Sequence, residues 1–206
     1  MRNNKYILFL LLLLPFFGFS QIKTTKLKET DIPKNISYKG KIVNAVRYTD
    51  ANGDTIVITT ETGTYTNIED PESGSDSELY AYSYTLENGV WQLKWKVYDF
   101  IKECPVDIQA NYVKDTFAVT DLNKDNKAEV WLMYTTVCHG DVSPSNMKII
   151  MYENGKKHAM RGENKVQVGN NEYMGGEYTF DNIFKQSPKE FRDYAAKLWN
   201  KHITGN

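Results

Sequence analysis

Residues 80–97 have the sequence YAYSYTLENGVWQLKWKV, in which two alternating apolar runs flank the pair Asn88-Gly89. Asn-Gly is a strong signal for a tight hairpin, because both central residues of a type I′ turn need positive φ. Counting outward from this turn predicts the cross-strand pairs Leu86 with Trp91, Tyr84 with Leu93, Tyr82 with Trp95 and Tyr80 with Val97. These paired residues are expected to form the buried face, and the residues between them are expected to face water.

Hairpin signals recur along the chain and indicate the fold class. Asn52-Gly53 and Asn154-Gly155 are two more Asn-Gly pairs, and a polar loop near residue 121 adds a fourth turn. A content of 14 Tyr, 4 Trp and 9 Phe also favours strands over helices. We therefore predict a mainly β fold of about eight to ten strands, with antiparallel sheets built from successive hairpins. The arrangement is expected to be sandwich-like or, given turn spacings of about 30–36 residues, propeller-blade-like.

The last hairpin predicts a second apolar face. Its members are Met147, Ile149, Met151, His158 and Met160. A single His on such a face is expected to be a hydrogen-bonded core residue rather than a ligand.

The chain ends in a predicted amphipathic helix over residues 188–202. Ser187 and Pro188, with Glu190 after them, mark the start of a helix. Apolar and His side chains then follow at helical spacing, at Phe191, Tyr194, Ala195, Leu198 and His202. This helix is expected to pack against the sheet.

The N-terminus has the features of a signal peptide. Met1–Lys5 is basic, Tyr6–Phe19 is apolar, and small residues at Gly18 and Ser20 fit cleavage after Ser20. About 14 apolar residues are too few to span a bilayer, which needs roughly 20. We predict a signal peptide over residues 1–20, an extended lead-in over residues 21–40 and a single β-rich domain over residues 41–206. The mature chain is expected to be exported, to the periplasm or the extracellular space, without a transmembrane span.

The charge balance disfavours nucleic acid as a partner, since 25 Lys and Arg face 26 Asp and Glu. Within this balance, residues 69–78 form an acidic and turn-rich run. The run predicts a solvated loop, with weak cation binding as the alternative.

Residues 119–130 carry the strongest chemical signal in the chain. Their oxygen-bearing side chains stand at positions 1, 3, 5 and 9 of a loop and are Asp121, Asn123, Asp125 and Glu129. Hard cations such as Ca²⁺ prefer six to eight oxygens, and the backbone carbonyl of Lys127 would add one more. The spacing predicts a calcium loop. The alternative is a polar hairpin turn in which Asp and Asn bond their own backbone.

The loop is not an EF-hand, because Asn126 and Leu132 stand where that motif needs Gly and a bidentate Glu. β-Branched and aromatic residues in 116–120 and 130–134 predict a strand on each side. In this setting the loop resembles the strand-loop-strand calcium sites of integrin-type propeller (FG-GAP-like) repeats, with Asn126 in the left-handed conformation. A calcium ion bound there would have a structural role, because it would clamp the two strands.

The chain has two cysteines, Cys104 and Cys138. In an exported protein they are expected to pair. The bond would tie the end of the strand that contains Trp91 to the end of the strand after the calcium loop. It would close a loop of about 34 residues.

A second chemically dense stretch begins with Cys138, His139 and Asp141. A nucleophilic site is disfavoured, because neighbouring side chains in an extended chain point apart and an oxidised Cys138 is no thiolate. A turn built by Gly140, Asp141 and Pro144 is the first interpretation. A ligand or metal contact from His139 or Asp141 is the alternative, and no catalytic residue is assigned.

Four motifs along the chain are TDLNKD (120–125), CHGDVSP (138–144), MKIIMYE (147–153) and MRG (160–162). Together they resemble a family of exported bacterial proteins associated with surface polysaccharide biosynthesis, over roughly residues 75–200. The loop departs from the regular D-x-D-x-D-G form at Asn123 and Asn126. The resemblance implies a place in a pathway, with surface polysaccharide or its assembly proteins as partners.

The predicted function is therefore an exported non-enzymatic factor that supports polysaccharide biosynthesis or attachment. The alternative is a metal-assisted glycan hydrolase or transferase, with His139 and Asp141 near the metal. The two hypotheses differ in whether a bound glycan is turned over.

Overall fold

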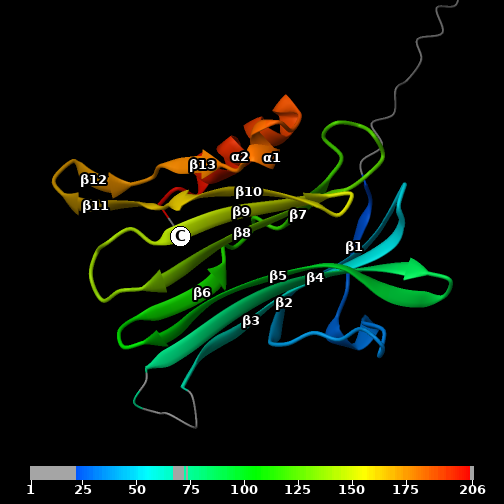
Figure 1. Cartoon of the computed structure of the whole chain (residues 1–206), viewed down its shortest axis with the longest axis horizontal. Helices are drawn as coiled ribbons and strands as arrows, with labels where there is room; N and C mark the ends of the chain where they lie inside the picture. Colours follow the sequence, from blue (N-terminus) through cyan, green and yellow to red (C-terminus); the bar gives the residue numbers. More distant parts are fainter. Residues whose placement is uncertain (1–21, 67–71, 73, 205–206) are drawn as a thin grey trace, which may run out of the picture.

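The computed structural model describes residues 22–66, 72 and 74–204, so the predicted signal peptide (1–20) lies outside the described residues. Two antiparallel sheets face one another in this part of the chain (Figure 1). Sheet A has the order β1 (Thr24–Lys26), β2 (Lys41–Asp50), β3 (Gly53–Thr66), β4 (Ser75–Glu87) and β5 (Val90–Cys104). Sheet B has the order β13 (Tyr178–Phe180), β10 (Lys156–Glu163), β9 (Asn146–Glu153), β8 (Glu129–Cys138) and β6 (Ile108–Tyr112), and β7 (Ala118–Thr120) also pairs with β8. A separate hairpin joins β11 (Lys165–Gly169) and β12 (Glu172–Gly175).

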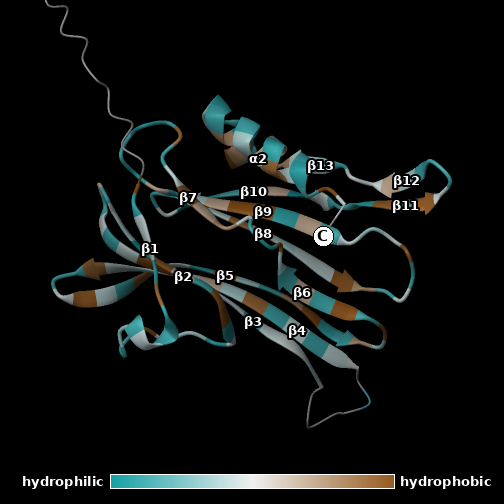
Figure 2. Cartoon of the chain, turned by 180° about the vertical axis from the view of Figure 1, so that it is seen from behind, coloured by the Kyte–Doolittle hydropathy of each residue, from teal (hydrophilic) through white to brown (hydrophobic). Residues whose placement is uncertain are grey.

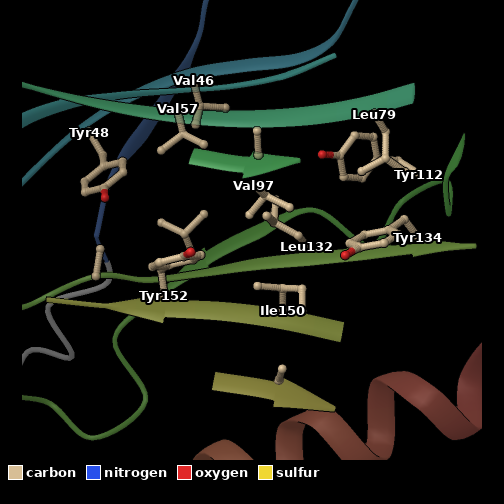
Figure 3. Close-up of a cluster of buried hydrophobic side chains, with 14 of the residues drawn as sticks. Val46, Tyr48, Val57, Leu79, Val97, Tyr112, Leu132, Tyr134, Ile150 and Tyr152 are labelled. Atoms are coloured by element: carbon tan, nitrogen blue, oxygen red, sulfur yellow. The ribbon is translucent and has the colours of Figure 1, made fainter. Parts of the chain in front are cut away.

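The main core lies between the two sheets (Figure 3). Its buried side chains include Val46, Val57, Leu79 and Val97 from sheet A and Leu132, Tyr134, Ile150 and Tyr152 from sheet B. Figure 2 shows hydrophobic and hydrophilic residues alternating along the strands, as expected when the two faces of a strand differ in burial. Full burial of an aliphatic side chain contributes about 1.5–3 kcal/mol. The prediction of a mainly β fold is confirmed, and its sandwich-like form is the one observed, but the described residues form thirteen strands rather than about eight to ten.

Two helices, α1 (Asn182–Lys185) and α2 (Lys189–Lys201), cover the outer face of sheet B. The predicted helix 188–202 is confirmed to within one residue at each end, and it buries Phe191, Ala195 and Trp199. Its start differs from the prediction, because the Ser187 hydroxyl donates to the Phe184 carbonyl at 2.7 Å instead of capping the helix. Among the described residues, no helix is long and apolar enough to cross a membrane.

A second core lies between the outer face of sheet B and the two helices, and His158 lies against it, as the predicted hairpin register requires. It stands opposite Met151, is 3% exposed, and meets the ring of Phe184 edge-on at 5.5 Å. Burial lowers the pKa of its imidazole, so the neutral form is favoured. The expected hydrogen bond is not found. Both ring nitrogens are buried and have no hydrogen-bond partner in the described part of the chain.

The lead-in covers the outer face of sheet A and contains β1 and a short 3₁₀ helix, η1 (Glu29–Asp31). Ile32 and Ile36 are buried against this face. The Tyr84 hydroxyl donates to the Ser37 carbonyl at 2.5 Å, and the Lys39 amide donates to the Tyr82 hydroxyl at 3.1 Å. The lead-in therefore buries a row of tyrosines that a two-layer sandwich would leave exposed.

The central hairpin contains a β-bulge that changes its predicted register. Leu86 pairs with Trp91 and Tyr84 pairs with Leu93, as predicted. Beyond these pairs the bulge at Lys94 shifts the register, so Trp95 stands opposite Ser83 rather than Tyr82. The predicted pairing is wrong from this point. The bulge turns Trp95 toward the main core, while Tyr82 faces the lead-in.

Of the acidic run 69–78, residues 69–71 and 73 lie outside the described residues, and its end, from Ser75 onward, belongs to strand β4. The Glu78 side chain is 4% exposed and forms ion pairs with Lys39 and, at 3.1 Å, with Lys102. The Tyr80 hydroxyl donates to the same carboxylate at 2.8 Å. Burial raises the pKa of Glu78, but these donors outweigh burial and hold the pKa at about 2. The predicted solvated loop is therefore wrong for this residue.

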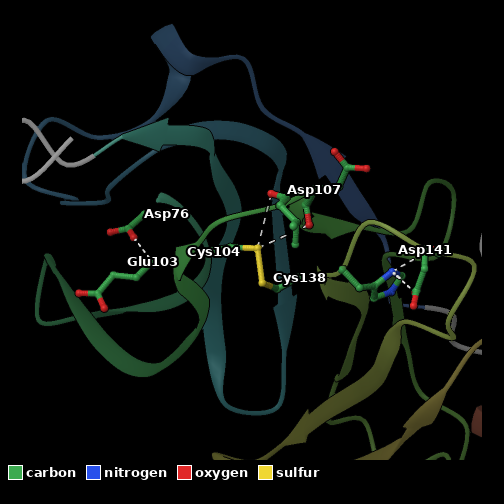
Figure 4. The surroundings of a disulfide bond; sticks show 8 residues. Asp76, Glu103, Cys104, Asp107, Cys138 and Asp141 are labelled. Atoms are coloured by element: carbon green, nitrogen blue, oxygen red, sulfur yellow. Dashed lines mark hydrogen bonds and ion pairs between the residues drawn. A yellow bond between two sulfur atoms is a disulfide. The ribbon is translucent and has the colours of Figure 1, made fainter. Parts of the chain in front are cut away.

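The Cys104 and Cys138 Sγ atoms lie 2.15 Å apart, with the Cα atoms 5.8 Å apart (Figure 4). Cys104 ends β5 and Cys138 ends β8, so the predicted bond joins sheet A to sheet B. The pairing of the two strand ends is as predicted.

Candidate functional site

A cleft of about 300 Å³ opens at one end of the sandwich, where residues of both sheets meet near the hairpin turns. Its polar lining consists of Asp50, Asn52, Thr55, Ser83, Thr85, Glu87, Lys94 and Asn154. Its aromatic lining consists of Tyr48, Trp95 and Tyr152. A concave site with aromatic surface and convergent polar groups is typical of ligand binding.

The turns that frame this cleft follow from local sequence. Asn88 and Asn154 have φ angles of 50° and 48°, and each is followed by a Gly with positive φ, as predicted. The first turn is displaced by one residue, because Asp50 pairs with Gly53 and leaves Ala51 and Asn52 as the loop. Gly53 has a φ of 116°, which favours glycine at this position.

Two aromatic rings from opposite sheets meet in the cleft. The Trp95 and Tyr152 rings are stacked, with centroids 4.2 Å apart and planes 8° apart. Trp95 is only partly buried. Burial raises the pKa of the Tyr152 phenol, which favours its neutral, hydrogen-bonding form. The stack gives the cleft an amphipathic aromatic surface.

Polar side chains fix the shape of the cleft around this stack. The Thr55 and Thr85 hydroxyls lie 3.1 Å apart, and Lys94 forms an ion pair with Glu87. The Asp50 carboxylate accepts from the backbone amide of Asn52 and, across to sheet B, from that of Ala128, both at 2.8 Å. These groups place hydroxyl and carboxylate oxygens at the cleft wall.

The predicted calcium loop lies beside the cleft and joins two paired strands, β7 and β8. Asn126 has a φ of 63°, so its predicted left-handed conformation is confirmed, and Lys124 has a φ of 62°. The Asp125 amide donates to Asp121 Oδ1 at 3.0 Å and to Asn123 Oδ1 at 3.2 Å. These two side-chain oxygens are therefore brought close together.

The remaining predicted ligands are placed differently. The Asp125 carboxylate accepts from the Lys127 amide at 2.9 Å and lies 3.6 Å from the Lys127 ammonium. Glu129 is fully buried, and its carboxylate accepts from the Leu122 amide and, at 2.6 Å, from the Thr120 hydroxyl. Burial raises the pKa of this carboxyl. Among the described residues, no three His, Cys, Asp or Glu side chains form a group that could hold a metal ion.

The loop braces both walls of the cleft. The Asn126 carbonyl accepts from the Ala51 amide of the β2–β3 turn at 2.7 Å. The Asn123 amide group donates to Glu153, at the end of β9, at 2.9 Å. Order in this loop therefore stabilises the position of a turn from each sheet.

His139 and Asp141 lie at the opposite end of β8 from the calcium loop. The ten residues of β8 separate the two regions by about 30 Å. His139 Nδ1 lies 3.1 Å from the Asp141 carbonyl, and Asp141 accepts from the Ser143 amide at 2.9 Å. The structure thus shows a turn at this position. The predicted placement of His139 and Asp141 near the metal is wrong, because an extended strand keeps them apart.

Calcium binding by the loop stays a prediction with a clear thermal signature. With a dissociation constant of about 10⁻⁴ to 10⁻³ M, Ca²⁺ at ten times this value would stabilise the fold by roughly 1.4 kcal/mol. We expect the melting temperature of the wild type to rise with Ca²⁺ and to fall with EDTA. The Asp121→Ala variant is expected to melt at the same temperature in both.

Asp193→Ala provides the control, because this carboxylate lies on the exposed side of α2 and pairs with Lys189. It is expected to keep the full response to Ca²⁺. A wild-type melting temperature that is indifferent to Ca²⁺ up to about 10 mM would show that the loop is a polar turn.

No family model matches the chain, and no match was found among the curated proteins or the solved structures.

Proposed function

We propose that the chain is an exported, non-enzymatic factor that supports cell-surface polysaccharide biosynthesis or attachment by binding a saccharide in the cleft. The observation that carries this proposal is the lining of the cleft, where the Trp95–Tyr152 stack is surrounded by hydroxyl, amide and carboxylate groups. A sugar ring has matching surfaces, since its faces carry C–H groups and its rim carries hydroxyls.

Export is supported by two features of the chain. The basic and then apolar N-terminus has the composition of a signal peptide. The Cys104–Cys138 pair is of a kind that persists in oxidising compartments.

Calcium would support saccharide binding through the loop. Outside the cell Ca²⁺ at millimolar levels would reach the affinity range of the loop, and an ordered loop would strengthen saccharide binding because it braces the cleft.

Trp95→Ala is expected to weaken saccharide binding roughly 30-fold, the effect of removing about 2 kcal/mol of contact at a binding hot spot. Glycan-array screening of the mature wild-type chain identifies the saccharide, and titration calorimetry then compares the variants. Trp91→Ala is the matched control, because Trp91 lies on the same strand but packs against the lead-in side of sheet A. It is expected to bind like the wild type.

Melting curves of both variants separate loss of binding from loss of fold. Unchanged affinity in a folded Trp95→Ala variant would contradict the cleft as the binding site. A hydrolysis screen on the same glycans tests the enzymatic alternative, which requires turnover of a bound glycan. In cells, an unchanged surface polysaccharide after loss of the protein would contradict both functions.

A further inference from the structure

The inner face of sheet B extends beyond the edge of sheet A. Strand β5 forms that edge and crosses β8 and β9, because Asp99 accepts from Tyr134 of β8 at 3.0 Å and from Lys148 of β9 at 2.6 Å, and Trp95 stacks on Tyr152. Strand β10 pairs with β9 on the side away from β8. Its residues on this face therefore lie just outside the cleft and beside the edge of β5.

Three cations line this part of the face, and we call Lys148, Lys157 and Arg161 the basic ledge. Lys157 stands directly opposite Tyr152, and Arg161 stands directly opposite Lys148. Lys157 and Arg161 are exposed. The ledge therefore starts at the aromatic stack and continues along β9 for four residues, roughly 14 Å.

The ledge has more positive charge than the fold neutralises. Lys148 has Asp99 as its carboxylate partner. In the described part of the chain, the side chains of Lys157 and Arg161 form no hydrogen bond or ion pair. Like charges directly opposite on neighbouring strands are destabilising. Burial is the largest cause that lowers the pKa of Lys157, and the nearby Arg161 and Lys148 lower it further, while Asp99 and Asp181 act in the opposite direction without restoring its usual value.

We infer that the saccharide bound in the cleft is anionic, and that its carboxylate or phosphate substituents bind the basic ledge while a sugar ring contacts Trp95. This inference rests on the proposed function of the cleft. Arginine presents paired N–H donors to carboxylate or phosphate, and lysine adds a point charge. A saccharide is favoured over nucleic acid because the cleft also carries Asp50 and Glu87, which would repel a chain charged at every unit.

The test uses a glycan array with matched pairs, in which each uronate or phosphorylated glycan has a neutral counterpart with the same backbone. The uronate and phosphate arms identify the source of the charge. We expect the wild type to prefer the charged member at least tenfold, and the preference to weaken with salt. In the double variant Lys157→Gln/Arg161→Gln the preference is expected to disappear, while affinity for the neutral member stays the same.

Lys96→Gln is the matched control, because Lys96 lies over the Tyr82 ring on the outer face of sheet A. It is expected to keep the preference. The double variant is expected to melt no lower than the wild type, since it removes repulsion. Equal binding of charged and neutral members, an unchanged preference in the double variant, or tighter binding of single-stranded DNA would overturn the inference alone. Binding of no saccharide at all would contradict the proposed function itself.

Discussion

A variant with Cys104→Ala and Cys138→Ala is expected to lose about 3–4 kcal/mol of unfolding free energy in the chain-entropy model. The bond closes a loop over a sequence separation of 34 residues, and it joins the ends of β5 and β8 across the two sheets. Without it the unfolded chain gains the entropy of that loop. Urea denaturation followed by tryptophan fluorescence measures the difference.

Reduced wild-type protein is the control for this variant, because it loses the bond but keeps both side chains. The two are expected to have the same stability. Saccharide binding by the folded variant is expected to persist, since about nine residues of β5, roughly 30 Å, separate Trp95 from Cys104. Equal stability of oxidised and reduced wild type, or two reactive thiols in denatured unreduced protein, would contradict the prediction.

Local features of this chain could be predicted from its sequence because their causes are local. The Asn88 and Asn154 turns need positive φ, and Asn-Gly is the pair that tolerates it best. The pairing of His158 with Met151 follows from counting outward from such a turn. The two cysteines left a single intramolecular pairing.

The bulge at Lys94 could not be predicted, because the predicted register assumed that one face of the hairpin is exposed to water. Strand β4 is buried on both faces, by sheet B on one side and by the lead-in on the other. The tyrosines at 80, 82 and 84 and the residues between them are therefore all compatible with burial. The sequence of β5 fits either register, and only packing selects the one that turns Trp95 inward.

The cleft depends on tertiary contacts in the same way. Trp95 and Tyr152 are 57 positions apart in the chain and come from different sheets, so no spacing predicts their stack. Glu78 shows the same limit, since its cationic partners Lys39 and Lys102 come from distant segments. The sequence did contain a signal for the cleft. Turns at the same ends of antiparallel strands lie close together, so the residues beside those turns surround one opening.

Trp131→Ala is expected to lower the unfolding free energy by about 3–5 kcal/mol, the cost of a large buried aromatic side chain. Trp131 is fully buried on the outer face of sheet B, where its ring lies 4.5 Å from that of Tyr194 in α2. Its indole N–H donates to the Thr120 hydroxyl at 2.8 Å, which in turn donates to Glu129 at 2.6 Å. The substitution therefore leaves a cavity under α2 and removes a donor beside the calcium loop.

Two variants separate these contributions in denaturant titrations. Trp131→Phe keeps most of the ring but loses the N–H, so a smaller loss of about 1–2 kcal/mol is expected. Trp91→Ala deletes the same side chain at a partly buried position and is expected to cost less than Trp131→Ala. If Trp131→Ala cost no more than Trp91→Ala, the packing of α2 on sheet B would not contribute as the structure indicates.

Thr120 and Glu129 connect Trp131 to the loop by hydrogen bonds. If the Trp131 variants lose only the packing of the helix, any Ca²⁺ response is expected to stay unchanged. A response that falls in both Trp131 variants would instead show that the hydrogen bonds from Trp131 through Thr120 to Glu129 support the loop that braces the cleft.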